Sequence, residues 1–393
     1  MICECFDKEV IDVLVAINEK GRTVKSHEEE KGGVFFCPCC KSEVILKKGE
    51  VKFPHFAHKQ LVTCQGASES ETLEHIQGKL LVAKNCERFG LSYELEAFLP
   101  EINQRADILI EKKTAIEFQC SSLSIERLKE RTEHYQSHGY KVFWVLGENL
   151  GKSNRLTELK KHFLYFNHQR GYHDFRLNVK ENKLVIRSYL GNHHRGVEMF
   201  EKAYSLNDKS LLDILECSVY KASFMIDNPL REVALRQQEF AKKLVNCEPS
   251  YLKLQEAFYL NNQHLLHLPG YVYFPSFYHP VLKERDLLVR SIILEVLFQQ
   301  QEVSYYELKQ HVIEKLSSEF CVNYANLEKH QVIDYIVSIY LVFLRKIGVI
   351  DMKNNENIRF FKKKVMNNEQ IEKFVKIRGE SLVLPLKYDM IIK

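Results

Sequence analysis

The stretch 69–147 limits the fold of this chain more than any other part, because its hydrophobic period switches repeatedly between two values. Apolar residues that recur every 3.6 positions predict helices, whereas alternating or continuous apolar runs predict strands. The predicted elements are a helix over 71–89, strands over 91–99, 105–110 and 115–120, a helix over 125–138 and a strand over 141–146. Ser70 and Ser124 are suitable N-caps for the two helices, and the nearly all-apolar last strand is typical of the centre of a sheet. The sequence therefore predicts an α-β-β-β-α-β domain.

The first predicted helix has two faces of different character. Its apolar stripe consists of residues at helical spacing, namely Leu73, Ile76, Leu80 and Ala83. Glu71, His75 and Lys79 follow one another at intervals of four residues, so they line a second face. Glu71 and His75 could therefore reach a cleft beside the strands, although a buried, hydrogen-bonded imidazole is an equally good interpretation of His75.

The rest of the chain suggests further domains, because 393 residues exceed what one hydrophobic core usually holds. Residues 1–66 contain short β-like runs with cysteines and histidines between them, and residues 156–393 become mostly helical. We therefore predict an α+β multidomain protein with a β module over 1–66, a core domain over 67–155 and a mostly helical C-terminal domain over 156–393. Net charge is only +4, so any DNA site must be a local basic patch.

The sequence also carries information on the compartment. The first ten residues lack the apolar core of a secretory signal, and the longest uncharged run, 335–344, is half of the roughly 20 residues that span a bilayer. Eleven cysteines without an export signal indicate a reducing environment. We expect a cytoplasmic protein with no membrane span.

Two carboxylates stand at matching places in the predicted strands. Asp107 and Glu117 lie on consecutive strands joined by a short turn, and the period of two groups Glu117 with Gln119. If these strands pair as a hairpin, the two carboxylates converge on one side of the sheet. Converging carboxylates are costly unless a cation joins them, and hard oxygen ligands suit Mg²⁺ or Mn²⁺. A pair of this kind on its own is more often part of a solvated edge.

The stretches Arg105-Ala106-Asp107 and Glu117-Phe118-Gln119-Cys120-Ser121, followed by Arg127, Arg131, Tyr135 and Trp144, resemble the nuclease-like domain of CoiA-type competence proteins. These belong to the PD-(D/E)xK nuclease superfamily, and the resemblance extends over about residues 30–147. It implies a metal-dependent DNA nuclease that processes incoming DNA during natural transformation and recombination. It also implies that Asp107 and Glu117 hold Mg²⁺ or Mn²⁺, that Glu71 is the acidic residue of the first helix, and that Gln119 occupies the usual lysine position.

The partners implied are DNA, as single strands or recombination intermediates, and recombination proteins. Arg127 and Arg131 lie four apart on one helical face, which suits either phosphate contact or a solvated surface. Lys79 is a further candidate for nucleic-acid binding, because it could supply the positive charge that Gln119 lacks. An amide orients water but brings no charge, so a nuclease fold that binds DNA or recruits a recombinase without cutting is the rival interpretation. A structural adaptor is a third.

A second candidate site lies in the N-terminal module. Cys37 and Cys40 have the C-x₂-C spacing that grips one tetrahedral ion, and His55 and His58 form a close pair about 15 residues later. This set predicts a structural Zn²⁺ site, with Cys39 as an alternative to Cys37. The other interpretation is a small β-domain in which the histidines pack and the thiols are free.

The C-terminal half shows three predicted helices, over 284–299, 305–320 and 329–346, followed by a strand pair around residues 349–361. Three helices and a β-wing are compatible with a winged helix, with Arg359 and Lys362 to Lys364 on or after the wing. A helical packing domain with a basic tail is an equally good interpretation, and we assign no chemistry to this half.

Overall fold

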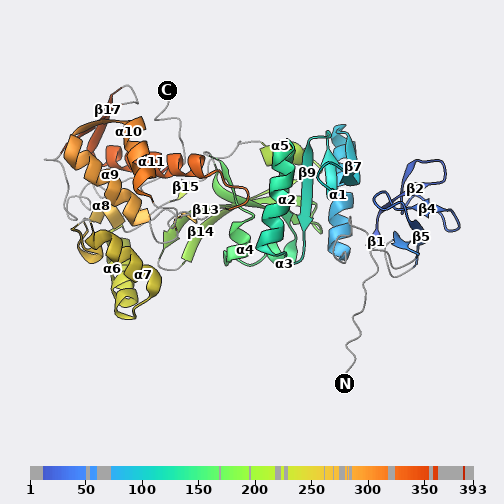
Figure 1. Ribbon diagram of the computed structural model, residues 1–393, viewed down its shortest axis with the longest axis horizontal. Helices are drawn as coiled ribbons and strands as arrows, with labels where there is room; N and C mark the ends of the chain where they lie inside the picture. The colour runs from blue at the N-terminus through green and yellow to red at the C-terminus, as the bar shows by residue number, and fades with distance from the viewer. Residues whose placement is uncertain are drawn as a thin grey trace, which may run out of the picture. The chain divides into compact units, whose positions relative to one another are not determined.

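The computed structural model describes residues 12–49, 54–59, 72–167, 170–193, 196–216, 223–224, 229–260, 262–268, 270–273, 279–280, 282, 286–316, 324–353, 357–361 and 384–385. The chain forms two compact units (Figure 1). One consists of Met1–Phe163, Asp174–Ile186 and Lys202–Cys217, and the other of Leu164–His173, Arg187–Glu201 and Ser218–Lys393.

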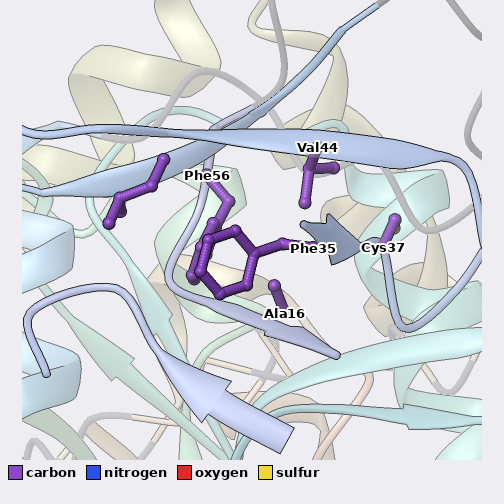
Figure 2. Packing of buried hydrophobic residues seen from close by; sticks show 6 residues of the cluster. Ala16, Phe35, Cys37, Val44 and Phe56 are labelled. Atoms are coloured by element: carbon purple, nitrogen blue, oxygen red, sulfur yellow. The ribbon is translucent and has the colours of Figure 1, made fainter. Parts of the chain in front are cut away.

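The first unit begins with a small antiparallel sheet, shown in dark blue in Figure 1. Its strands are β1 (Asp12–Val13), β2 (Val15–Asn18), β3 (Thr23–Lys25), β4 (Phe35–Phe36), β5 (Glu43–Lys47) and β6 (His55–His58), in the order β1-β6-β5-β4-β2-β3. Figure 2 shows its core, where Phe35 and Phe56 pack with ring centroids 4.8 Å apart. Cys37 joins this core, which fixes the start of the cysteine segment against the sheet.

The predicted α-β-β-β-α-β order is confirmed in the same unit. The elements are α1 (Leu73–Phe89), β7 (Tyr93–Leu99), β8 (Gln104–Ile110), β9 (Thr114–Gln119), α2 (Ile125–Ser137) and β10 (Lys141–Leu146). Strands β7, β8 and β9 are antiparallel neighbours, and β10 runs parallel to β9. The sheet continues beyond β10 with β12 (Gly171–Asn178), β13 (Lys183–His193) and β14 (Gly196–Ser205), and the short β11 (Tyr165–Asn167) pairs with β12. The apolar strand β10 is therefore internal, as predicted.

Helices α1 and α2 pack on opposite faces of this sheet. The side chain of Glu117 contacts α2, whereas its neighbour Phe118 packs against Gly78 of α1. A Cβ atom at Gly78 would lie 2.1 Å from the Phe118 ring, so only glycine lets the helix come this close. Successive strand residues point to opposite faces, which is why one strand serves both helices.

The two helix starts differ in how well the sequence predicted them. Ser124 caps α2 as predicted, by accepting the N–H of Arg127 at 3.2 Å. The cap of α1 is Thr72, whose hydroxyl accepts the N–H of His75 at 3.2 Å, and the predicted cap Ser70 lies outside the described residues. Leu73, placed in the predicted apolar stripe, is 59% exposed, because it occupies the first turn beyond the sheet.

The remaining elements of the first unit are short. They are α3 (Glu148–Gly151), α4 (Glu158–Lys161) and α5 (Leu211–Glu216). Asn85 of α1 ties the loop before α5 to the core, since its amide donates to the carbonyls of Leu206 and Lys209 at 2.6 and 2.9 Å.

The second unit is mostly helical, as predicted. Its first part contains β15 (Ser223–Phe224), which pairs with β19 (Leu384–Pro385), then α6 (Pro229–Val245), α7 (Pro249–Tyr259), the 3₁₀ turn η1 (Leu265–His267) and α8 (Gly270–Tyr273). Its second part runs α9 (Asp286–Gln300), β16 (Glu302–Ser304), α10 (Tyr305–Lys315), α11 (Lys329–Lys346), β17 (Ile350–Lys353) and β18 (Asn357–Phe360).

This second part has the predicted three helices and strand pair, with a sheet in the order β16-β18-β17. The third helix, α11, is buried over most of its length, so its side chains serve as core. Arg359 on β18 is exposed but lies 3.3 Å from Glu302, and Lys362 to Lys364 fall outside the described residues. No helix in the described part of the chain is long and apolar enough to cross a membrane.

Candidate functional site

Three carboxylates form one row across strands β7, β8 and β9. The register of β8 and β9 ends at the pair Ile108 and Ile116, and Asp107 and Glu117 are the next residues along the two strands. On the other side of β8, Leu95 pairs with Ile108 and Ala97 with Ala106, and Glu96 and Asp107 are the residues between these pairs. We call Glu96, Asp107 and Glu117 the acidic row. Asp107 and Glu117 were predicted to converge on one side of the sheet, and Glu96 was not predicted as a site residue. In the structure Asp107 bonds His75 of α1, whereas Glu117 bonds Arg131 and Tyr135 of α2 on the other face of the sheet.

Asp107 stands in the middle of the acidic row, and its partners come from α1 and β9. Its Oδ2 atom lies 3.0 Å from Nε2 of His75 and accepts the N–H of Phe118 at 2.8 Å. Burial disfavours the charged carboxylate, but the charges of His75 and Lys79 and the two hydrogen bonds outweigh it and hold the pKa of Asp107 well below its usual value. Asp107 is therefore an anion at neutral pH.

Glu117 is held from the α2 side of the sheet. Its Oε1 atom accepts bonds from the Arg131 guanidinium at 2.5 Å and from the Tyr135 hydroxyl at 2.6 Å. Burial raises the pKa of Glu117 to about 7, with Asp107 adding to the rise and Arg131 and Tyr135 opposing it. The same arginine donates to the carbonyl of Arg105 at 3.3 Å and lies over the ring of Trp144 at 5.4 Å. Arg131 is thus the counter-ion of Glu117.

Glu96 and Lys79 form a buried ion pair at the other end of the row. The ammonium Nζ of Lys79 lies 2.8 Å from Oε1 of Glu96, and their side chains are 0% and 2% exposed. Lys79 was predicted to contact nucleic acid. Its ammonium has no exposed surface, so it is not placed for such a contact; its charge acts inside the protein, on Glu96 and Asp107.

The remaining predicted site residues are Gln119, Arg127 and Glu71, and Cys120 follows Gln119 in the chain. Gln119 is half-buried and lies two residues after Glu117 on β9. Its side-chain amide donates a hydrogen bond to the carbonyl of Ser121 at 3.0 Å. Arg127 is exposed on α2, where a phosphate could reach it. Glu71 lies outside the described residues. Cys120 is buried, and burial together with the charge of Glu74 raises the pKa of its thiol to about 12, which agrees with an inert core residue.

The donor set of Asp107 and Glu117 suits a hard divalent cation. Among the described residues, every bond to Asp107 uses Oδ2 and every bond to Glu117 uses Oε1. The second oxygen of each carboxylate accepts no bond from the described residues. Carboxylate oxygens are the ligands that Mg²⁺ and Mn²⁺ take from proteins, with water filling the remaining positions.

The N-terminal module contains a second cluster, formed by Cys37, Cys40 and His58. The ligand atoms of these three lie within 4.8 Å of one another, and Sγ of Cys40 is 3.3 Å from Nε2 of His58. Burial opposes ionisation of Cys40, but hydrogen bonds from Ser42 and contacts with His58 and Cys37 lower its pKa to about 6. Within the described residues this is the one group of three or more such side chains with that spacing. Thiolates and an imidazole fit Zn²⁺.

His55, predicted as a ligand, is not part of this cluster. It lies with His58 on β6, and side chains three positions apart in a strand point to opposite faces. His55 is instead buried, 5% exposed, on the other side of the sheet. Cys39, the predicted alternative to Cys37, is also absent from the cluster, whereas Cys37 belongs to it.

Glu96 is the residue that sequence reasoning missed. The period of two in a regular strand would group Glu96 with Glu94 on one side of β7, and Glu94 is exposed. Glu96 departs from the alternation because its φ is +49°, an angle that interrupts the regular pairing of β7 and turns its carboxylate inward. No pattern of apolar residues signals such a local reversal.

Comparisons with known proteins match two regions of the chain. The family model described as the nuclease-like domain of competence protein CoiA matches residues 71–219, and the model for the N-terminal domain of CoiA matches residues 19–67. The chain is 35% identical over 116 residues to competence protein CoiA of Bacillus subtilis (strain 168). That alignment covers 29% of this chain and 31% of the relative's length. No solved structure matches the chain.

Proposed function

Because the chain belongs to the CoiA family of competence proteins, we propose that it is a metal-dependent nuclease that cuts DNA at the acidic row. The observation that carries this proposal is that Asp107 and Glu117 follow the last pair of the β8–β9 register, and that the second oxygen of each accepts no bond from the described residues. In the wider role proposed here, the protein processes single strands or recombination intermediates in the cytoplasm during natural transformation, alongside recombination proteins.

Each residue of the site would have a distinct role. Asp107 and Glu117 would hold Mg²⁺ or Mn²⁺, which when bound polarises a phosphate and lowers the pKa of water. His75 and the N–H of Phe118 orient Asp107, while Arg131 and Tyr135 orient Glu117. Gln119 would position water through hydrogen bonds rather than by charge. Arg127, exposed on α2, would contact the DNA backbone.

A cleavage assay tests this proposal. Purified full-length protein is incubated with single- and double-stranded DNA in Mg²⁺, in Mn²⁺ and in EDTA. We expect products only with a divalent cation. DNA that is bound in a gel-shift assay but stays intact with both metals would refute the enzyme and establish the alternative, a non-catalytic binding protein on a nuclease fold. The observation favouring that alternative is Gln119, whose amide faces the carbonyl of Ser121 and adds no charge.

For the N-terminal module we propose a structural Zn²⁺ bound by Cys37, Cys40 and His58. Replacing Cys40 with serine or His58 with alanine is expected to lower the zinc content to less than about a tenth, because a site left with two ligands loses most of its affinity. Elemental analysis of the purified proteins measures this. His55→Gln and Cys39→Ser are matched controls on the same segments and should retain the ion. Zinc lost from His55→Gln but retained by His58→Ala would contradict the assignment.

A further inference from the structure

The N-terminal module contacts the core domain through Glu96. The N–H of Leu14, at the break between β1 and β2, donates to both carboxylate oxygens of Glu96 at 3.1 Å. A second contact lies nearer the surface, where Lys25 donates to the Tyr93 hydroxyl at 2.9 Å. The two contacts differ in burial. Lys25 pairs with the exposed carboxylates Glu28 and Glu87, whereas Leu14 and Glu96 are only 2% and 4% exposed.

Glu96 combines three features that a simple docking contact would not need. It is buried in the acidic row, it adopts a left-handed φ of +49°, and it serves donors from two directions. Leu14 approaches from the module, Lys79 approaches from α1 at 2.8 Å, and the Arg105 guanidinium lies 4.0 Å away as a further counter-charge. An uncompensated charge here would be costly, so the positions of Lys79 and Leu14 are both tied to this carboxylate.

Lys79 connects Glu96 to Asp107. Its ammonium is bonded to Glu96, Lys79 and Asp107 line the same small cavity between α1 and the sheet, and the charge of Lys79 lowers the pKa of Asp107. Held in place by Glu96, the ammonium of Lys79 supports the Asp107 carboxylate through its charge. If Lys79 is released or removed, Asp107 loses this support, and the bond that it accepts from the N–H of Phe118 at 2.8 Å weakens.

We propose that Glu96 is a positioning residue, which couples the docking of the N-terminal module to the placement of Asp107 by holding Lys79. The coupling extends into the module, since Val13 of β1 pairs with Phe56 on β6, the strand that carries His58. The consequence for DNA cleavage rests on the proposed function, but the coupling itself does not. Docking of the N-terminal module therefore contributes to the placement of Asp107 in the acidic row.

Hydrogen–deuterium exchange on the full-length protein tests the coupling without metal or DNA. In Glu96→Gln, peptides containing the Leu14 amide and peptides containing the Phe118 amide are both expected to exchange at least about tenfold faster, because each loses a bond to a fixed carboxylate. Glu94→Gln, an exposed neutralisation on the same strand, should leave both unchanged. Lys25→Met should leave the Phe118 amide unchanged, because it breaks only the outer contact.

Faster exchange at Leu14 alone in Glu96→Gln would reduce Glu96 to a docking contact and overturn the proposal. If this variant does not fold, the double variant Lys79→Met/Glu96→Gln leaves no buried charge unpaired in this pair. It is expected to show the faster Phe118 exchange as well, because Lys79 no longer acts on Asp107. Wild-type protection of Phe118 in the folded double variant would likewise overturn the coupling. Neither result depends on whether the protein cleaves DNA.

Discussion

Replacing Asp107 with asparagine is expected to lower the rate of metal-dependent DNA cleavage by at least about a hundredfold. A bound metal ion contributes several kcal/mol of transition-state stabilisation, and each 1.36 kcal/mol corresponds to roughly a factor of ten. Asparagine keeps the shape of the side chain and can still accept the N–H of Phe118, so the fold should survive. The substitution removes the negative charge with which Asp107 would bind a cation. Single-turnover cleavage in Mn²⁺ measures the effect.

The matched control is Asp208→Asn, an exposed carboxylate in the loop after β14, for which no change is expected. Thermal melting of both variants separates loss of function from loss of folding. Full cleavage by a folded Asp107→Asn protein would show that the acidic row does not carry the reaction. The observed activity would then have to come from another site or from a contaminant.

Replacing Arg131 with alanine is expected to lower the free energy of unfolding of the core domain by about 3 to 5 kcal/mol. The cause is Glu117, whose side chain is 3% exposed and would lose its cation at 2.5 Å. Trp144 provides the measurement, because it is the single tryptophan of the chain and lies under the Arg131 guanidinium. Its fluorescence during urea unfolding reports this domain separately from the helical unit.

Two further variants show whether the loss comes from the unpaired carboxylate. Arg127→Ala, four residues earlier on the exposed side of α2, should change stability by less than about 0.5 kcal/mol. Combining Arg131→Met with Glu117→Gln removes both charges and should recover much of the loss. An Arg131→Ala protein as stable as the wild type would contradict the pairing of Arg131 with Glu117.

The core domain was predictable because its elements bury one face each. The period of 3.6 residues in α1 and α2 and the apolar run of β10 follow directly from which side chains meet the sheet. The hairpin of β8 and β9 also follows, because only three residues, 111–113, lie between the two strands. The resemblance to a nuclease-like family rested on these same segments.

The partners of the charged residues could not be predicted in the same way. Lys79 and Glu96 are 17 residues apart and meet only because α1 crosses β7, and nothing in their neighbours marks them as buried. His55 and His58 show a different failure. Treating them as a ligand pair ignored the strand that contains them, and the alternation of β6 places them on opposite faces. Long-range ion pairs depend on tertiary packing, which local patterns do not encode.

The proposed nuclease function depends on one divalent cation shared by the second oxygens of Asp107 and Glu117. Crystals grown with Mn²⁺ test this directly through the anomalous scattering of the metal. We predict a peak within about 2 to 2.5 Å of one oxygen of each carboxylate. A Mn²⁺ peak bound elsewhere, or none in the row at saturating metal, would contradict the claim.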